Sequence, residues 1–266
     1  AWPFFIFGST AFFHYFCSMK LYGLIGRRLG HSFSADFFNS AFKDKCIDAR
    51  YCLFEIPEIG CLHSLVAENP NLAGLNVTIP YKESVIPFLD SLTDDARSIG
   101  AVNLIEFAGC GDSLKLIGHN TDAPAFRNMA EPLIAGLRRR KALILGTGGA
   151  AKAARFALDC LGIESVLISR SSRKGTLSYN QLDNDQVNDA GMIVNATPAG
   201  MWPDTSYSPP FPYQWLSPAH ICIDLIYNPA TTTFMAECAQ KGATVKNGLE
   251  MLIGQARIGA GIWGLE

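Results

Sequence analysis

The chain has 266 residues, of which 48% are hydrophobic and 17% are charged, and its formal net charge is −2. This composition is typical of a folded globular protein with one large or two modest domains. A charge so close to neutral, without a long stripe of basic residues, argues against a nucleic-acid-binding protein.

The first 18 residues differ from the rest, because they are rich in Phe and are interrupted by Pro3, Gly8 and His14. They lack the basic start and the small-residue cleavage site of a signal peptide, and they are too irregular for a membrane-spanning helix. Met19-Lys20, followed by an apolar strand, is typical of a natural start. We therefore expect residues 1–18 to be a non-native or mis-started extension, with a membrane or partner anchor as the alternative.

From Met19 onward, segments with strand-like and helix-like patterns alternate along the chain. The expected strands are 21–25, 50–55, 72–77, 102–107, 114–118, 142–145, 165–168, 192–194, 221–224 and 244–246. The expected helices are 34–45 with Ser34 as its cap, 59–68, 81–92 with a break near Pro87, 122–137, an Ala-rich helix after Gly146, 233–241 and 249–263. Such alternation predicts parallel sheets with right-handed crossovers, apart from a hairpin formed by 102–107 and 114–118.

The segment around Gly146 has the pattern of a dinucleotide-binding turn. The apolar run 142–145 suits a buried parallel strand, and the spacing of Gly146, Gly148 and Ala151 fits G-x-G-x-x-[G/A]. In that pattern the glycines allow a tight turn and close approach of a pyrophosphate, which binds at the helix N-terminus. An ordinary strand-to-helix turn is the alternative, but the flanking strand and helix favour a nucleotide.

A cluster of cations and hydroxyls follows the next expected strand. An NAD enzyme usually carries an acidic residue there, about 20 positions past the glycines. This chain has Ser169-Arg170-Ser171-Ser-Arg173-Lys174 instead. Arg side chains bind phosphate with paired hydrogen bonds, so the cluster favours the 2′-phosphate of NADP over NAD, with a solvated basic loop as the alternative.

Two titratable residues lie where strands end, which is where open α/β sheets bind ligands. Lys82 follows the strand that ends at Pro80, and Asp122 closes Gly118-His-Asn-Thr-Asp122 at a helix start. Together they would form a proton-transfer pair, such as a nicotinamide enzyme needs. A surface lysine and a helix-capping aspartate are the alternatives, and spacing alone does not establish the pairing.

The chain resembles the shikimate dehydrogenase family from Met19 to its C-terminus, with the family's motifs in order. They are Ser32-Phe-Ser34, Asn76-Val-Thr-Ile-Pro-Tyr-Lys82, Gly100-Ala-Val-Asn103, Asn120-Thr-Asp122, Gly146-Thr-Gly-Gly149, Asn195-Ala-Thr-Pro-Ala-Gly-Met201, Asp224-Leu-Ile-Tyr227 and Gly248-Leu-Glu-Met-Leu-Ile-Gly-Gln255. The resemblance implies reversible NADPH-dependent reduction of 3-dehydroshikimate to shikimate, in the biosynthesis of chorismate and aromatic amino acids.

The resemblance also implies roles for individual residues. Lys82 and Asp122 would be the catalytic pair. The substrate would be held by that pair together with Ser32, Ser34, Thr78, Asn103, Tyr227 and Gln255. NADP would be held by Asp94, Gly146, Thr147, Gly148, Gly149, Ala150, Ser169, Arg170, Ser171, Arg173, Lys174, Thr197, Met201, Leu225 and Gly248. No metal is implied.

The chain departs from the family pattern at a few positions. Ala35 stands for Pro and Phe38 for His in the segment after Ser34, and Phe38 is expected to pack on the apolar side of its helix. In the phosphate-binding segment, Ser169 replaces Asn and Ser171 replaces Thr, while the cations are kept. These changes bear on helix placement and adenosine binding rather than on the chemistry.

The predicted fold is α/β with two domains: a Rossmann-like NADP-binding domain and a smaller α/β substrate domain with a mixed, mainly parallel sheet. The substrate domain is expected at 19–121, completed by the C-terminal helix 248–266, and the NADP-binding domain at 122–247. Two other functions stay open, namely a quinate/shikimate dehydrogenase that uses NAD or NADP, and a non-catalytic NADP-responsive regulator. The presence of both Lys82 and Asp122 argues against the regulator.

The expected partner is the small-molecule substrate, with neither nucleic acid nor membrane. The chain is expected to be a monomer or a homodimer. Its eight cysteines form no CxxC pair and no metal-ligand spacing, which is typical of reduced thiols in a cytoplasmic protein.

Overall fold

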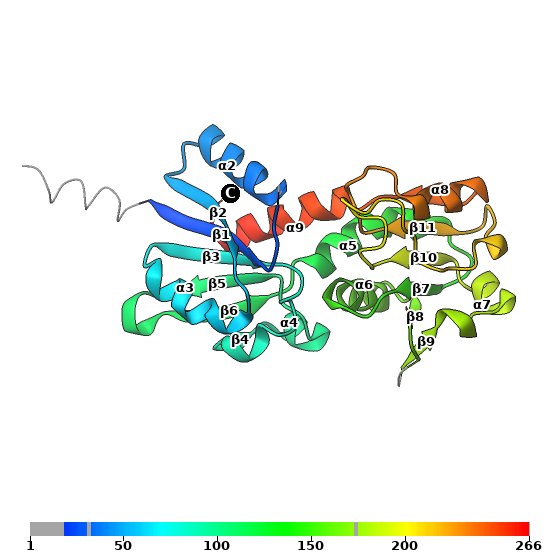
Figure 1. Cartoon of the computed structure of the whole chain (residues 1–266), viewed down its shortest axis with the longest axis horizontal. Coiled ribbons are helices and arrows are strands. Elements are labelled where there is room, and N and C mark those ends of the chain that lie inside the picture. The colour runs from blue at the N-terminus through cyan, green and yellow to red at the C-terminus, as the bar shows by residue number, and fades with distance from the viewer. Residues whose placement is uncertain (1–18, 31–32, 173–174, 266) are drawn as a thin grey trace, which may run out of the picture. The chain divides into compact units, whose positions relative to one another are not determined.

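The computed structural model describes residues 19–30, 33–172 and 175–265 (Figure 1). These residues form two six-stranded sheets, each in its own compact unit. The first unit comprises the described residues up to Thr93, with Val102–His119 and 262–265. The second comprises Asp94–Ala101 and Asn120–Gly261. Residues 1–18, with their predicted extension, lie outside the described residues.

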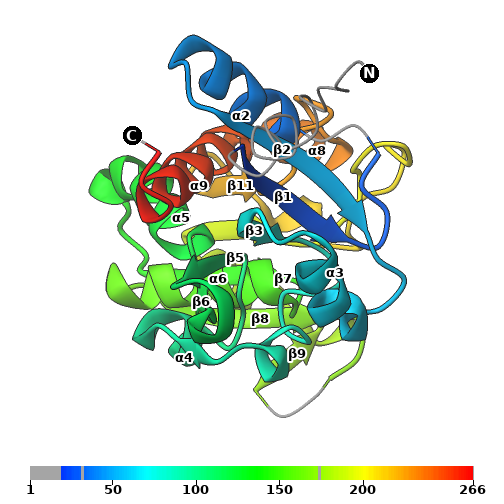
Figure 2. The ribbon, with the colours of Figure 1, turned by 90° about the vertical axis from the view of Figure 1, so that its left-hand side faces the viewer.

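The first unit is built on a mixed sheet with the order β2-β1-β3-β5-β6-β4, most of which can be followed in Figure 2. Its strands are β1 (Lys20–Gly26), β2 (Ala49–Glu55), β3 (Leu72–Val77), β4 (Ser91–Leu92), β5 (Leu104–Ala108) and β6 (Lys115–His119), and its helices are α2 (Phe33–Asp44) and α3 (Leu62–Glu68). The pairs β1–β2, β1–β3 and β4–β6 are parallel, whereas β3–β5 and the hairpin β5–β6 are antiparallel. This is the mixed, mainly parallel sheet that the sequence predicts.

An aromatic cluster joins α2 to the first sheet. Phe38, on α2, is 1% exposed and stacks on Tyr51 with ring centroids 4.8 Å apart. Trp263 lies 4.9 Å from Tyr22 and 5.5 Å from Phe38, measured between ring centroids. The predicted packing of Phe38 is therefore confirmed, and the residue that departs from the family pattern belongs to the hydrophobic core.

The second unit is built on a parallel sheet with the order β12-β11-β10-β7-β8-β9. Its strands are β7 (Lys141–Leu145), β8 (Glu164–Ser169), β9 (Thr176–Ser178), β10 (Met192–Asn195), β11 (Ile221–Asp224) and β12 (Thr244–Lys246). Its helices are α4 (Asp94–Ile99), α5 (Asp122–Ala130), α6 (Gly149–Cys160), α7 (Asn184–Asp189), α8 (Thr233–Gln240) and α9 (Leu249–Ile262), of which α9 ends one residue inside the first unit. In strand order this is a doubly wound, Rossmann-like sheet, as predicted.

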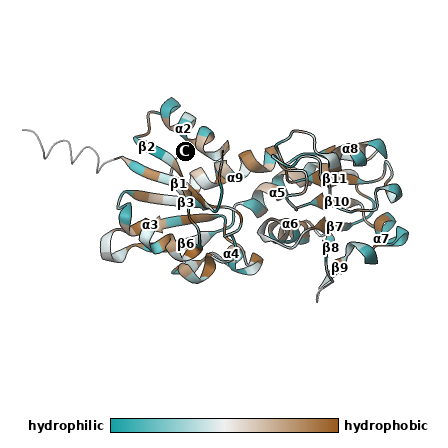
Figure 3. Ribbon diagram, in the orientation of Figure 1, coloured by the Kyte–Doolittle hydropathy of each residue, from teal (hydrophilic) through white to brown (hydrophobic). Residues whose placement is uncertain are grey.

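The central strands of this sheet are made of hydrophobic residues, coloured brown in Figure 3, and their side chains belong to two separate cores. Ala142 and Ile144 of β7 belong to a core with residues of α5, α6 and α9. Leu143 and Leu145, which point to the opposite face, belong to a second core with residues of α7 and α8. A strand buried on both faces requires a continuous apolar run, which is the pattern that the sequence shows.

Several predicted elements are wrong in extent or kind. The segment 81–92 is not a helix: it holds turns, the short 3₁₀ helix Ile86–Phe88 and β4. Helix α5 ends at Ala130 and gives way to the 3₁₀ helix Glu131–Gly136, because Pro132 lacks the N–H that the α-helical ladder needs. Helix α2 begins at Phe33, so Ser34 lies in its first turn and is not its cap. Helices α4 and α7 and strand β9 were not predicted.

Helix α9 contributes to the core of the second unit, where Met251 packs. Residues 249–261 belong to the second unit, whereas the predicted domain limits place 248–266 with the substrate domain. No helix among the described residues is long and apolar enough to cross a membrane. No group of three or more His, Cys, Asp or Glu side chains in that part of the chain is placed to hold a metal ion.

Candidate functional site

Lys82 lies in a turn that is anchored on both sides. Val102 donates its backbone N–H to the Lys82 carbonyl oxygen at 2.7 Å. Tyr81, 3% exposed, donates its hydroxyl to the Ile56 carbonyl oxygen at 2.6 Å, and Val85 is fully buried. The backbone of Lys82 is thus fixed just beyond the carboxyl end of β3, although no helix holds it.

A buried chain of hydrogen bonds connects the predicted substrate residues of the first unit. Tyr51 donates its hydroxyl to Asn76 Oδ1 at 2.7 Å, and Asn76 donates its amide to the Asn103 carbonyl oxygen at 3.3 Å. The Ser34 hydroxyl is hydrogen-bonded to Tyr51. Burial raises the pKa of Tyr51 well above its usual value, so the phenol stays neutral and donates. Ser34 and Asn103 are therefore tied to one another through β2 and β3.

Thr78 completes this group at the end of β3. Its backbone N–H donates to the Ile25 carbonyl oxygen at 3.0 Å, and its own carbonyl oxygen accepts the backbone N–H of Tyr81 at 2.9 Å. The first unit thus gathers Ser34, Thr78, Lys82 and Asn103 around the carboxyl end of β3. Ser32 lies outside the described residues.

Asp122 is the first residue of α5 and is 5% exposed. It is not the helix cap: Asn120 Oδ1 instead accepts the backbone N–H of Ala123 at 3.0 Å. The alternative interpretation of Asp122 as a capping residue is therefore wrong. A carboxylate at the start of a helix is stabilised by the positive end of the helix dipole.

Gln255 lies next to the Asp122 segment within the second unit. The Thr121 hydroxyl donates to Gln255 Oε1 at 3.5 Å, and Gln255 donates its amide to the Leu252 carbonyl oxygen at 3.1 Å. The start of α5, where Asp122 lies, is thus joined to Gln255 of α9 through the hydrogen bond of Thr121, although the two segments are far apart in the sequence. Whether they meet the group around Lys82, which belongs to the first unit, stays a prediction.

The glycine turn between β7 and α6 has the backbone that the sequence pattern predicts. Gly146 has a φ of 115°, which favours glycine, and a Cβ there would lie 3.1 Å from the Ala196 carbonyl oxygen. Gly148 caps α6 in an extended conformation with open space beside it, and Ala151 is fully buried. Thr147 and Gly148 are exposed, and Gly149 and Ala150 open the helix. The first N–H groups of α6 have no partner within the helix, so the turn suits a phosphate.

Ser169 and Arg170 follow at the carboxyl end of the neighbouring strand β8. The Ser169 hydroxyl donates to the Ser171 carbonyl and accepts the Ser171 backbone N–H, at 3.2 Å for the latter. This closes a tight turn from which Arg170 is exposed. Arg173 and Lys174 lie outside the described residues.

The ends of β10 and β11 share a buried polar group. Asp224 Oδ1 accepts from Asn195 Nδ2 at 3.1 Å and from the Ile226 backbone N–H at 3.0 Å. Asp224 Oδ2 accepts the Thr232 hydroxyl at 2.6 Å, and Thr197 donates its hydroxyl to Asn195 Oδ1 at 2.6 Å. Burial raises the pKa of Asp224 to about 6, against the lowering effect of these three donors to its carboxylate.

The remaining predicted positions of the second unit lie around these strand ends. Gly248 donates its backbone N–H to the Ile226 carbonyl oxygen at 3.0 Å and lies against the backbone of Leu225. Tyr227 is partly exposed, and burial raises its pKa. Met201 is 41% exposed in the loop after β10, and Asp94 is exposed at the start of α4.

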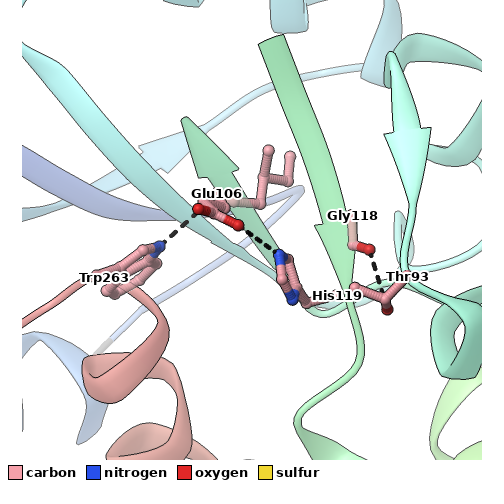
Figure 4. Close-up of polar contacts among 6 residues, drawn as sticks. Thr93, Glu106, Gly118, His119 and Trp263 are labelled. Atoms are coloured by element: carbon pink, nitrogen blue, oxygen red, sulfur yellow. Dashed lines mark hydrogen bonds and ion pairs between the residues drawn. The ribbon is translucent and has the colours of Figure 1, made fainter. Parts of the chain in front are cut away.

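His119, directly before the Asn120-Thr-Asp122 motif, is paired rather than a free surface residue. Its Nε2 lies 2.8 Å from Glu106 Oε2, across the hairpin of β5 and β6 (Figure 4). The same view shows Thr93 beside Gly118, whose carbonyl it contacts through its hydroxyl at 3.4 Å. These contacts fix the end of β6, from which the chain continues to Asp122.

Known proteins resemble this chain in sequence and in fold. The family model of the shikimate dehydrogenase substrate binding domain matches residues 24–105. A relative from Carboxydothermus hydrogenoformans named shikimate dehydrogenase (NADP(+)) is 36% identical over 259 residues, which are 92% of this chain and 91% of the relative. The chain belongs to the shikimate dehydrogenase family.

Other members of the shikimate dehydrogenase family support the same assignment. The shikimate dehydrogenase (NADP(+)) of Methanococcus maripaludis is 33% identical, covering 92% of this chain and 91% of the relative. A crystal structure of a shikimate dehydrogenase in complex with NADP⁺ has a TM-score of 0.80 at 32% identity, covering 92% of this chain and 90% of that chain. The Thermus thermophilus enzyme in complex with NADP(H) and shikimate has a TM-score of 0.79 at 29% identity, with 92% and 93% covered.

Sequence reasoning missed the residues that support these shikimate dehydrogenase motifs. Tyr51 had no signal beyond its place in a strand. Asn76, Asn195 and Asp224 stand inside quoted motifs, but their roles depend on hydrogen bonds to residues far away in the sequence.

Proposed function

We propose that this chain catalyses the reversible reduction of 3-dehydroshikimate to shikimate with NADPH as the reductant. The observation that carries the proposal is that both members of the expected proton-transfer pair, Lys82 and Asp122, are present in a chain 33–36% identical to relatives named shikimate dehydrogenase (NADP(+)). A binding protein without catalysis has no need of such a pair.

The cofactor site is proposed at the carboxyl ends of β7, β8, β10 and β11. The positive φ at Gly146, the tight contact that a Cβ there would make, and the open space at Gly148 support a pyrophosphate at the start of α6. The exposed Arg170 supports binding of the 2′-phosphate, with Ser169, Ser171, Arg173 and Lys174 as further contacts. Thr197, Met201, Leu225 and Gly248 are proposed to contact the nicotinamide half, and Asp94 to approach the cofactor.

The substrate is proposed to be bound mainly by neutral polar side chains. Ser32 and Ser34 would donate hydroxyl hydrogen bonds to the substrate carboxylate, and the remaining polar contacts would come from Thr78, Asn103, Tyr227 and Gln255. Neutral donors satisfy a small polyhydroxylated acid without a metal. An analogue that lacks a hydroxyl would leave these buried groups unpaired, which supplies selectivity.

Proton transfer is assigned to Lys82 and Asp122. When bound, NADPH supplies a hydride to the carbonyl carbon of the substrate. Lys82 would donate a proton to the oxygen that becomes the hydroxyl, and Asp122 would hold the ammonium in place. In the oxidation of shikimate the same lysine would accept the proton. One residue would therefore act as the acid in one direction and as the base in the other, and no second base is needed.

The domain limits and the cellular context are part of the proposal. Residues 19–121 with 248–266 would form the substrate domain, and 122–247 the NADP-binding domain. The protein is expected to be a monomer or a homodimer. It is expected in the cytoplasm, because its cysteine pattern is typical of reduced thiols.

The first test follows the absorbance of reduced nicotinamide with shikimate and NADP, then with NAD in place of NADP and with quinate in place of shikimate. Rapid reduction with shikimate and NADP alone supports the proposed reaction and the phosphate site together. Comparable turnover with NAD or quinate would instead assign the chain to enzymes of broader specificity. Binding of NADP without turnover of either substrate would overturn the proposal in favour of a regulator.

A further inference from the structure

The Asp224 carboxylate is the centre of the polar group at the ends of β10 and β11. It is fully buried, and its partners come from three different segments. Asn195 is the last residue of β10, Ile226 follows β11, and Thr232 caps α8 by accepting the Met235 backbone N–H at 3.2 Å. One side chain therefore fixes three backbone segments relative to one another.

The group extends into the loop after β10. Asn195 Oδ1 accepts both the hydroxyl of Thr197, at 2.6 Å, and its backbone N–H, at 3.1 Å. Thr197 Oγ1 in turn accepts the Ala199 backbone N–H at 3.3 Å. Asp224 thus controls this loop through Asn195, without touching it directly.

The partners of Asp224 in the described structure are neutral donors, and no cation is among them. A buried carboxylate without a cation is costly to keep ionised, and its desolvation raises its pKa. A neutral amide in its place would offer one acceptor oxygen where the carboxylate offers two. The group therefore needs the carboxylate in order to accept from all three donors at once.

The two loops that Asp224 connects carry Thr197 and Met201 on one side and Leu225 and Tyr227 on the other. These are the residues proposed above to contact the nicotinamide half of the cofactor and the substrate. The adenosine half is assigned to other segments, namely the glycine turn and the turn after β8.

We propose that Asp224 is a positioning residue that aligns the loops after β10 and β11, and thereby selects the bound position of the nicotinamide half of NADP. The inference rests on the proposed function for the location of that half. It goes beyond the proposed function by assigning nicotinamide alignment to a residue that contacts neither cofactor nor substrate.

The test is isothermal titration of Asp224→Asn with two ligands, NADP⁺ and adenosine 2′,5′-bisphosphate, which carries only the adenosine half. NADP⁺ affinity is expected to fall by about tenfold, the effect of roughly one to two lost hydrogen bonds. Adenosine 2′,5′-bisphosphate affinity is expected to change less than twofold. Asp183→Asn is the matched control, because it neutralises an exposed carboxylate of the same unit that caps α7.

Equal weakening of both ligands would mean a general loss of structure, and unchanged affinity for both would mean that Asp224 aligns nothing; either result overturns the proposal. If Asp224→Asn does not fold, Thr232→Val replaces it, since it removes the hydroxyl donor to Oδ2 while Thr232→Ser keeps it. The same split between the two ligands is then expected for the valine variant alone, and its absence overturns the proposal.

These titrations do not depend on turnover. If the wild-type protein fails to reduce NADP with shikimate, the proposed function fails, while a selective loss of NADP⁺ affinity in Asp224→Asn would still stand. The two failures are therefore distinguishable.

Discussion

Gly248 lies against the backbone carbonyl of Leu225. A Cβ at position 248 would lie only 2.1 Å from the Leu225 carbonyl oxygen, which is too close for any side chain. The contact is closed by the hydrogen bond from the Gly248 N–H to the Ile226 carbonyl oxygen, at 3.0 Å. The start of α9 is thus held against the chain that follows β11, and only glycine permits this approach.

We expect Gly248→Ala to lower the free energy of unfolding by about 1–3 kcal/mol, because the backbone of Leu225 must move to admit the methyl group. The same movement is expected to weaken NADP binding, since Leu225 is proposed to contact the nicotinamide. Urea unfolding and NADP titration measure the two effects. Gly136→Ala is the control, because a Cβ there meets nothing within 4 Å. Wild-type stability in Gly248→Ala would contradict the close approach.

Lys82→Ala is expected to lower kcat by about 10²–10⁴, because it removes the group that is proposed to accept the proton in shikimate oxidation and to donate it in the reverse reaction. NADP affinity is expected to stay nearly unchanged, since Lys82 is assigned no contact with the cofactor. Steady-state kinetics with shikimate and NADP, together with NADP titration, measure both. Lys115→Ala, which removes an exposed lysine on β6, should retain full activity. Turnover of Lys82→Ala at the wild-type rate would refute its catalytic role.

Arg170→Ala is expected to weaken NADP binding by ten- to a hundredfold, which corresponds to about 1.5–3 kcal/mol for a hydrogen-bonded ionic contact to phosphate. NAD lacks the 2′-phosphate, so its affinity should not change. Arg155→Ala is a suitable control, because Arg155 is an exposed arginine on α6 in a long pair with Asp159, with 4.0 Å between Nε and Oδ2. An equal loss of NADP and NAD affinity would place the 2′-phosphate elsewhere.

Phe38→Ala is expected to lower the free energy of unfolding by about 3–4 kcal/mol, because it empties the stacking position on Tyr51. Phe37→Ala, at a partly exposed position of the same helix, should cost less. Denaturant unfolding of both variants measures the difference. Equal losses would mean that the aromatic cluster is not what joins α2 to the sheet.

The sequence was sufficient to predict the second unit's sheet in most respects. A continuous apolar run such as 142–145 has one stable environment, a strand covered on both faces, and the glycines after it specify the turn. The strand ends at Val77 and Asp224 and the hairpin of β5 and β6 followed from the same local patterns.

Local patterns failed where tertiary contacts decide the backbone. The segment 81–92 has the apolar spacing of a helix, but Pro80 and Pro87 limit its hydrogen bonds and Tyr81 is fixed instead by the Ile56 carbonyl. The polar groups around Asn76 and Asp224 include hydrogen bonds between residues 25 positions apart, Tyr51 and Asn76, and 29 positions apart, Asn195 and Asp224, which no short window of sequence reveals. The alternative that Asp122 caps α5 was wrong, because Asp122 is the first residue of the helix and Asn120 Oδ1 accepts the Ala123 backbone N–H.

Stability is expected to depend on pH through Asp224. Its folded-state pKa, about 6, is above the ordinary value of 3.8, so the folded protein holds this proton more tightly than the unfolded chain does. Protonation of Asp224 therefore contributes most to the free energy of unfolding below pH 3.8. This contribution, about 3 kcal/mol in total, is lost as the pH rises to about 6. The pKa of the neighbouring Cys238 thiol is raised by its hydrogen bond to Cys222 and by burial, so that thiol stays neutral over this range.

Asp224→Asn removes this titration. The difference in free energy of unfolding between the variant and the wild type is therefore expected to shift in favour of the variant between pH 4 and pH 6.5, whatever its value at pH 4. Urea unfolding of both proteins at four or five pH values across this range measures the shift. A constant difference between Asp224→Asn and wild type would mean that the Asp224 carboxylate is ionised throughout. In that case the three hydrogen bonds would stabilise the ionised carboxylate by more than its burial destabilises it.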